Sequence, residues 1–253
     1  MAAAIAIRTS SRTQHSRFTG GHPVAKTSRP PFLRPVPSAS ELGQDAVGLE
    51  RIGSLQVVAR GVTVVDQGDQ AEHVFKVVSG ALRVVRLLSD GRRSVINFLL
   101  PGDFFGLADS GTYTHSLEVL ADASFVRYPK RQLREVLDND PAAGRRFFNL
   151  MCEQLSAAEE RQLTLCRKNA VERIASFLLA MADRSNAQKN SSGTTVRLPM
   201  NRADIADYLG LTIETVSRVL THLREQQIIE VPTASQIVLC DCDRLTALSD
   251  GEI

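Results

Sequence analysis

The chain has 253 residues, of which 43% are hydrophobic and 23% are charged, a composition typical of a globular protein of one or two domains. Its formal net charge is +2 and its pI about 8.4, but the charge is unevenly distributed. Residues 1–40 hold six of the 30 basic side chains, five of the ten prolines and no acidic residue, so the rest has 24 basic and 28 acidic groups. The basic pI therefore does not by itself indicate binding to nucleic acid.

The basic N-terminal segment is too polar and proline-rich to build a core, so we expect residues 1–40 to be a disordered tail. An acid-free leader rich in Arg and Ser is also typical of an organellar transit peptide, which stays open as an alternative. The longest apolar run, residues 174–182, is far shorter than the roughly 20 residues that cross a bilayer. Four cysteines in a chain of this length do not form a disulfide framework. We expect a cytoplasmic protein with no membrane partner.

The sequence from Leu55 to Tyr128 consists of short β-branched segments separated by turns that contain Gly, Pro or Asp. Asp90-Gly91, between two apolar segments, is typical of a tight hairpin. Many short strands with frequent turns favour a sandwich, barrel or roll over βαβ units. We therefore predict a β-domain over residues 41–131. Its expected strands are 55–59, 62–65, 74–78, 81–88, 94–100, 116–120 and 124–128.

Beyond Pro141 the apolar residues follow a helical period with spacings of 3 and 4, flanked by charged side chains. A narrow seam of this kind is typical of a helix that pairs with its copy in a second protomer, although it can also pack on its own domain. We predict a dimerisation helix within residues 132–168, and hence a homodimer. The seam consists of Phe148, Met151, Leu155, Ala158 and Leu165. A further helix over Ala170–Ala182 and a polar loop over residues 184–195 are expected to follow.

The most informative segment is residues 200–229. Asn201 is a favourable N-cap for a helix over Arg202–Leu209, and Gly210 can end that helix in the left-handed conformation. Thr212 then caps a second helix that runs to about Gln226. A helix-turn-helix needs a small residue between its helices, a glycine in the turn and an aliphatic residue on the second helix. These places are taken by Ala206, Gly210 and Val216.

The second helix has two opposite faces. One is an apolar stripe made of Val216, Val219, Leu220 and Leu223, and the other carries Glu214, Ser217, Arg218 and Thr221. Such a polar face fits the major groove of DNA, where Arg donates hydrogen bonds to guanine and Glu accepts one from the amino group of cytosine. The alternative is a solvated face with a Glu214–Arg218 pair. The turn motif favours reading of double-stranded DNA.

Residues 170–253 contain eight basic and eleven acidic side chains, which opposes DNA binding. Affinity for phosphate depends on local cations and N–H groups, so a few placed residues suffice, and two copies of the domain would bind more tightly than one. The segments 228–231 and 236–239 are expected to form a hairpin wing beside the two helices. The expected phosphate and supporting contacts are Thr212, Thr215, Thr221, Arg197, Arg202 and Arg224.

Residues 55–239 resemble the CRP/FNR family of bacterial transcription regulators, and within it the FixK-like branch. The resemblance is strongest in RADIADYLGLTIETVSRVL and LCRKNAVERIASFL. It implies an α+β chain with a jelly-roll-like β-roll, a dimerisation helix and a C-terminal winged helix-turn-helix over residues 169–253. It also implies that Glu214, Ser217 and Arg218 read a TTGA…TCAA palindrome. Such regulators recruit RNA polymerase, commonly in a low-oxygen or nitrogen-fixation cascade.

Two departures within the family bear on the mechanism. The tail and the β-domain contain no cysteine for an FNR-type iron–sulfur cluster, and GLADSGTYTHSLEV lacks the arginine that binds a cyclic-nucleotide phosphate. The resemblance therefore implies an activator with no cofactor, no metal and no bound effector. A haem or ligand sensor that uses His73 or His115 is the alternative. A cupin-like enzyme is a remote one, because no catalytic constellation occurs and we expect no enzymatic activity.

Cys166 and the hairpin tip are open to two interpretations each. Cys166 lies between the dimer helix and the DNA-binding domain, where oxidation would disturb the hinge; the simpler interpretation is a small buried residue. The hairpin tip at residues 90–93 either contacts RNA polymerase or is only a turn. Cys240 and Cys242 are too close together, and too isolated, to form a zinc site.

Overall fold

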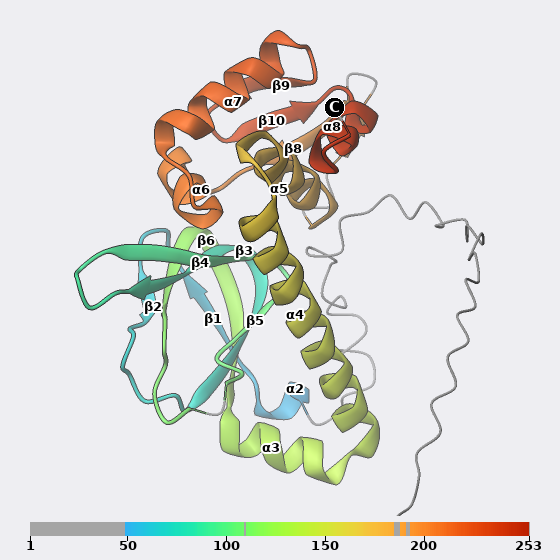
Figure 1. The fold of residues 1–253 in the computed structure, drawn as a ribbon. Coiled ribbons are helices and arrows are strands. Elements are labelled where there is room, and N and C mark those ends of the chain that lie inside the picture. The colour runs from blue at the N-terminus through green and yellow to red at the C-terminus, as the bar shows by residue number, and fades with distance from the viewer. Residues whose placement is uncertain (1–48, 109, 185–187, 191–192, 253) are drawn as a thin grey trace, which may run out of the picture.

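The computed structural model describes residues 49–108, 110–184, 188–190 and 193–252, and Figure 1 shows its arrangement. The expected disordered tail, residues 1–40, lies outside the described residues. A β-roll is followed by a long helix that runs along it, and this helix leads into a smaller domain of helices and a sheet. No helix in the described part of the chain is long and apolar enough to cross a bilayer.

The β-roll is one six-stranded antiparallel sheet in which β6 and β3 are the central strands. Its strands are β1 (Ser54–Val58), β2 (Thr63–Val65), β3 (His73–Leu87), β4 (Arg93–Leu99), β5 (Phe104–Phe105) and β6 (Ser116–Pro129). The expected separate strands 74–78 and 81–88 are a single strand, β3, and 116–120 and 124–128 are a single strand, β6. Gly80 lies where the pairing shifts register, so it bends β3 as a bulge instead of ending it.

Aromatic side chains fill one end of the roll. Phe75 lies edge-on to Phe125 with ring centroids 5.5 Å apart, and Tyr113 stacks on Phe105 at 5.6 Å. The Tyr113 hydroxyl donates a 2.8 Å hydrogen bond to the carbonyl oxygen of His73, which satisfies its polar group. This part of the roll is therefore a packed core.

The roll is followed by two helices, because the expected single helix within residues 132–168 is divided at Asp140. They are α3 (Lys130–Asn139) and α4 (Pro141–Arg167), and a short helix α2 (Leu49–Ile52) precedes the roll. The Asp140 side chain accepts hydrogen bonds from the backbone N–H groups of Ala142 and Ala143, and Pro141 occupies the first helical position. Both features favour the start of a new helix.

Helix α4 packs on the roll through a face other than the expected seam. Its buried residues are Ala143, Leu150 and Thr164, whereas Phe148 and Leu155 are 67% and 62% exposed. Met151 and Leu165 are half-buried and Ala158 is exposed. Phe148 and Leu155 are thus not covered by their own domain, whereas Met151 and Leu165 are partly covered.

The C-terminal domain combines a helix-turn-helix with a four-stranded sheet in the order β7-β8-β10-β9. Its elements are α5 (Ala170–Arg184), β7 (Gln188–Asn190), β8 (Gly193–Arg197), α6 (Arg202–Leu209), α7 (Ile213–Glu225), β9 (Ile229–Thr233), β10 (Gln236–Leu239) and α8 (Cys242–Ser249). The expected helices and wing are present, which confirms the fold class. The expected loop over 184–195 was wrong in part, because β7 and the start of β8 lie within it.

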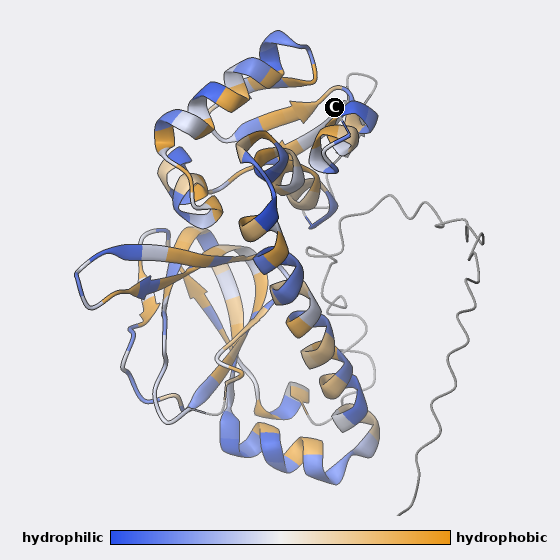
Figure 2. Ribbon diagram, in the orientation of Figure 1, coloured by the Kyte–Doolittle hydropathy of each residue, from blue (hydrophilic) through white to orange (hydrophobic). Residues whose placement is uncertain are grey.

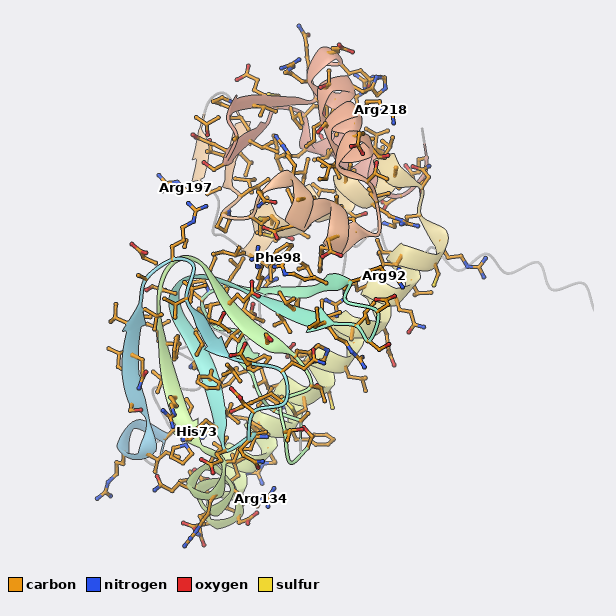
Figure 3. All side chains as sticks on the ribbon, turned by 90° about the vertical axis from the view of Figure 1, so that its left-hand side faces the viewer. His73, Arg92, Phe98, Arg134, Arg197 and Arg218 are labelled. Atoms are coloured by element: carbon orange, nitrogen blue, oxygen red, sulfur yellow. The ribbon has the colours of Figure 1, made fainter. Side chains whose placement is uncertain are left out.

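The two domains share one apolar core. Phe98 of β4 is 2% exposed, and its ring centroid lies 4.9 Å from that of Tyr208 on α6 and 6.3 Å from that of Phe177 on α5. Figure 3 shows Phe98 at this junction, between the sheet and the C-terminal domain. Burial of these rings fixes the helix-turn-helix against the roll.

Replacing Phe98 tests this packing. We expect Phe98→Ala to lower the free energy of unfolding, measured by urea titration, by about 3–5 kcal/mol, because it leaves a cavity between the domains. Leu87→Ala is the control, since Leu87 is 57% exposed. It should change the stability by less than about 0.5 kcal/mol. Equal effects of the two variants would show that the domains do not pack together in solution.

Candidate nucleic-acid interface

Side-chain caps define the two helices of the helix-turn-helix. The Asn201 side chain accepts a 2.8 Å hydrogen bond from the backbone N–H of Asp204, whose carboxylate accepts from Asn201 in return, so α6 begins with a capping box. Gly210 ends α6 with φ of 63°, and Thr212 caps α7 by accepting from the backbone N–H of Thr215. The expected N-caps and the expected glycine turn are confirmed.

Helix α7 separates an inner face from an outer face. Val216, Val219, Leu220 and Leu223 are buried, whereas Glu214, Ser217, Arg218 and Thr221 are exposed. Figure 2 shows apolar and polar stripes along this helix, and Figure 3 places Arg218 at its outer edge. Ala206 of α6 and Val216 of α7 are buried in the shared core, as a tight pair of helices requires.

The outer face carries complementary hydrogen-bonding groups. The pKa of Glu214 is lowered by hydrogen bonds from its own backbone N–H and from the Thr212 hydroxyl, so its carboxylate is ionised at neutral pH. An ionised carboxylate only accepts hydrogen bonds and a guanidinium only donates them. Glu214 therefore suits the amino group of cytosine, and Arg218 suits the acceptors of guanine.

Beside this face is a small groove, of about 160 Å³, lined by Arg202, Ser217, Leu220, Thr221, Arg224 and Val231. The Nη1 atom of Arg202 is buried and has no hydrogen-bond partner among the residues that the structure describes. Burial lowers the pKa of Arg202, but a guanidinium keeps its charge in proteins. The lining of this groove thus includes two guanidinium groups, those of Arg202 and Arg224.

Arg197 does not belong to this group. It lies on β8 and lines a crevice between the β-roll and the C-terminal domain, together with Arg184. Figure 3 shows Arg197 in this gap between the domains, away from Arg218. The structure thus brings Arg202, Thr221 and Arg224 together and leaves Arg197 apart.

Acidic residues of α6 face the roll, and sequence reasoning missed this contact. Asp204 is 3% exposed and accepts a 2.6 Å hydrogen bond from Arg83 of β3, which also pairs with Glu118. Asp207 accepts a 2.8 Å hydrogen bond from the backbone N–H of Val95 on β4. Two of the negative charges that oppose DNA binding are therefore turned away from α7.

Arg173 on α5, within the segment LCRKNAVERIASFL, is a second connecting residue, and the sequence did not indicate its contacts. Its guanidinium donates to the carbonyl oxygens of Leu165, Lys168 and Leu209, at 2.8, 2.8 and 2.9 Å. It thereby joins the end of α4 to the end of α6, next to the turn at Gly210. Because its acceptors are backbone carbonyls, the sequence offered no signal for this link.

His73 and Cys166 were considered above for haem binding and for redox chemistry. The His73 ring lies 2.8 Å from Nη2 of Arg127, and burial and that arginine lower the pKa of His73. No cluster of three or more potential metal ligands occurs within the described ranges. Cys166 is exposed, so its interpretation as a small buried residue was wrong.

A β-roll, a long helix with an exposed apolar stripe and a winged helix-turn-helix with an outward polar face define a DNA-binding transcription regulator. Residues 55–140 match the cyclic nucleotide-binding domain family, and residues 172–248 match the Crp-like helix-turn-helix domain family. The chain belongs to the CRP/FNR family, and more particularly it is similar to regulators named FixK. The expected family is thereby confirmed.

Three relatives illustrate this similarity. The nitrogen fixation regulation protein FixK of Azorhizobium caulinodans is 39% identical over 227 residues, which cover 90% of this chain and 91% of that protein. The transcriptional activator protein FnrL of Cereibacter sphaeroides is 34% identical over 80% of this chain and 83% of its own. The structure of FixK2 from Bradyrhizobium japonicum superposes with a TM-score of 0.71 at 37% identity, over 78% of this chain and 97% of that one.

The pair of Arg83 and Asp204 makes a testable prediction. Arg83→Met leaves the Asp204 carboxylate buried with one partner fewer, and we expect it to lower the free energy of unfolding by roughly 3 kcal/mol. Arg83→Met with Asp204→Asn should be less destabilised than the sum of the two single variants, because no uncompensated charge remains. Additive effects in a urea-unfolding cycle would contradict an interdomain ion pair.

Proposed function

We propose that the protein is a transcriptional activator that binds a TTGA…TCAA-type palindrome as a homodimer and recruits RNA polymerase. The observation that carries the proposal is the outer face of α7, which presents an ionised acceptor and a guanidinium beside a groove lined by two further arginines. Base contacts would come from Glu214, Ser217 and Arg218. Phosphate and supporting contacts would come from Thr212, Thr215, Thr221, Arg202 and Arg224.

The homodimer is supported by the exposed stripe of α4. Family regulators with this helix-turn-helix are dimeric, and exposed apolar residues spaced by 3 and 4 suit a coiled-coil contact. We place Phe148, Met151, Leu155, Ala158 and Leu165 in this seam, with the exposed Leu163 next to it. The seam would set the separation of two α7 helices on the two half-sites of an operator.

Activation without a ligand in the roll is supported by two features. The interior at Phe75, Phe105 and Tyr113 is packed with aromatic rings. Direct contacts between β4 and α6 already fix the DNA-binding domain. The similarity to FixK and FnrL favours a low-oxygen or nitrogen-fixation cascade, which would operate in the cytoplasm.

We propose that the hairpin between β3 and β4 contacts RNA polymerase. Figure 1 shows this hairpin projecting from the roll. Arg92 at its tip is exposed and pairs with Asp90 at 2.7 Å. A projecting charged tip is accessible to a neighbouring protein while α7 lies on DNA.

Selection of bound sequences from a random DNA pool tests the function. A palindrome with two half-sites one helical turn apart is expected, because two copies of α7 would enter successive major grooves. Recovery of unrelated sequences, or of single half-sites only, would refute the proposed readout.

Arg218→Ala tests the base-reading face. We expect a loss of about 1–3 kcal/mol in binding and relaxed preference at one base position. Arg224→Ala is the matched control, since loss of a phosphate contact should weaken binding to all DNA sequences alike. It should also reduce the slope of log K against log salt concentration by about one. Unchanged base preference in Arg218→Ala would place the readout elsewhere.

Met151→Glu with Leu155→Glu tests the dimer seam. Two carboxylates placed next to their copies should repel, so we expect monomers by analytical ultracentrifugation and loss of palindrome binding. Glu153→Lys, on an exposed position of the same helix, is the control and should stay dimeric. If the double variant stays dimeric, the dimer interface is formed by residues outside this seam.

A further inference from the structure

A crevice of about 630 Å³ lies between the β-roll and the winged helix-turn-helix domain, at one side of their shared core. Leu100, Pro101 and Ala81 line it from the roll, and Arg184, Arg197 and Leu198 line it from the other domain. Its volume is within the range of about 300–1,000 Å³ that is typical of small-molecule sites, which favour domain boundaries. Neither the DNA-reading face nor the dimer seam uses these residues.

The charge of the crevice is positive. Its lining, within the described part of the chain, includes two arginines and no acidic residue. Arg184 is buried and is neutralised by Asp103, with which it forms an ion pair, and it also donates to the carbonyl oxygen of Phe98. Arg197 is exposed at the crevice and has no ion-pair partner among the described residues. One guanidinium is therefore left uncompensated.

We propose that this crevice binds a small organic monoanion, a carboxylate with an apolar body, through Arg197. One free guanidinium matches one negative charge, and its planar fork suits a carboxylate in two parallel hydrogen bonds. The aliphatic and proline side chains of both walls suit the apolar body. A dianion such as a phosphate monoester would leave one of its charges without a free cationic partner in the lining.

The bound molecule would touch both domains. A ligand that bridges them changes the free energy of their relative orientation, and the position of α7 depends on that orientation through α6. By linkage, the factor by which the ligand changes DNA affinity equals the factor by which DNA changes ligand affinity. This regulatory consequence rests on the proposed function, whereas binding of the carboxylate does not.

Methyl NMR of the full-length dimer with benzoate tests the site in the absence of DNA. The methyl groups of Ala81, Ala121 and Leu198 report on both walls of the crevice. We expect their signals to shift with a dissociation constant of about 1 mM, as befits a fragment of this size. Benzamide, which has the same shape without the charge, should shift them far less.

Arg197→Ala should weaken benzoate binding by about tenfold, because it removes a charge-assisted hydrogen bond. Arg244→Ala removes another exposed arginine, on α8, and should leave binding unchanged. Equal binding by Arg197→Ala and the parent, equal shifts by benzamide, or no shifts at these methyl groups would each overturn the proposal.

Fluorescence anisotropy with the selected operator measures whether benzoate binding in the crevice changes the affinity for DNA. Saturating benzoate should change the operator affinity of the parent, but not that of Arg197→Ala at the same ionic strength. Methyl shifts without a change in DNA affinity would overturn the coupling and leave the site standing. If the unsubstituted protein does not bind the operator, the proposed function is overturned, whereas the NMR result on benzoate binding still stands.

Discussion

Asp204 is an acidic side chain buried between two domains, and the orientation of the recognition helix depends on how its charge is compensated. Arg83 and Arg93 reach it from the β-roll, at 2.6 and 3.8 Å, while the same carboxylate accepts from the backbone at the start of α6. A buried carboxylate without such partners would cost several kcal/mol. The start of α6, and with it α7, is therefore held by groups that belong to the other domain.

This arrangement also explains how a net-acidic domain presents a surface for DNA. Asp204 and Asp207 face the roll, and helix α8 lies on the other side of the domain from α7, as Figure 1 shows. Arg202, Arg218 and Arg224 lie on or beside the recognition face, together with Glu214. Net charge is a sum over the whole surface, whereas phosphate binding depends on the few groups within reach of the backbone.

Sequence reasoning found the features that are encoded locally. The caps at Asn201 and Thr212, the turn at Gly210 and the two faces of α7 follow from residues only a few positions apart. It missed β7 and the continuity of β3, because short polar strands and bulges have no periodic signal, and it also missed the helix α8. The contacts of Arg83 and Arg173 were out of reach, since their partners lie far away in the sequence. Arg197 lies apart from the other predicted phosphate contacts, because charge alone does not tell which side of a strand a residue faces.

The core shared by β4, α5 and α6 limits how independent the two domains are. Phe98, Phe177 and Tyr208 bury one another across the boundary. A winged helix-turn-helix cut away at Ala170 would expose the rings that now face the roll, together with the Asp204 carboxylate. The roll and the DNA-binding domain should therefore melt in one cooperative transition. The winged helix-turn-helix domain therefore does not fold independently of the roll. Exchanging it between regulators of this family would require the contacting surface of β3 and β4 to be exchanged with it.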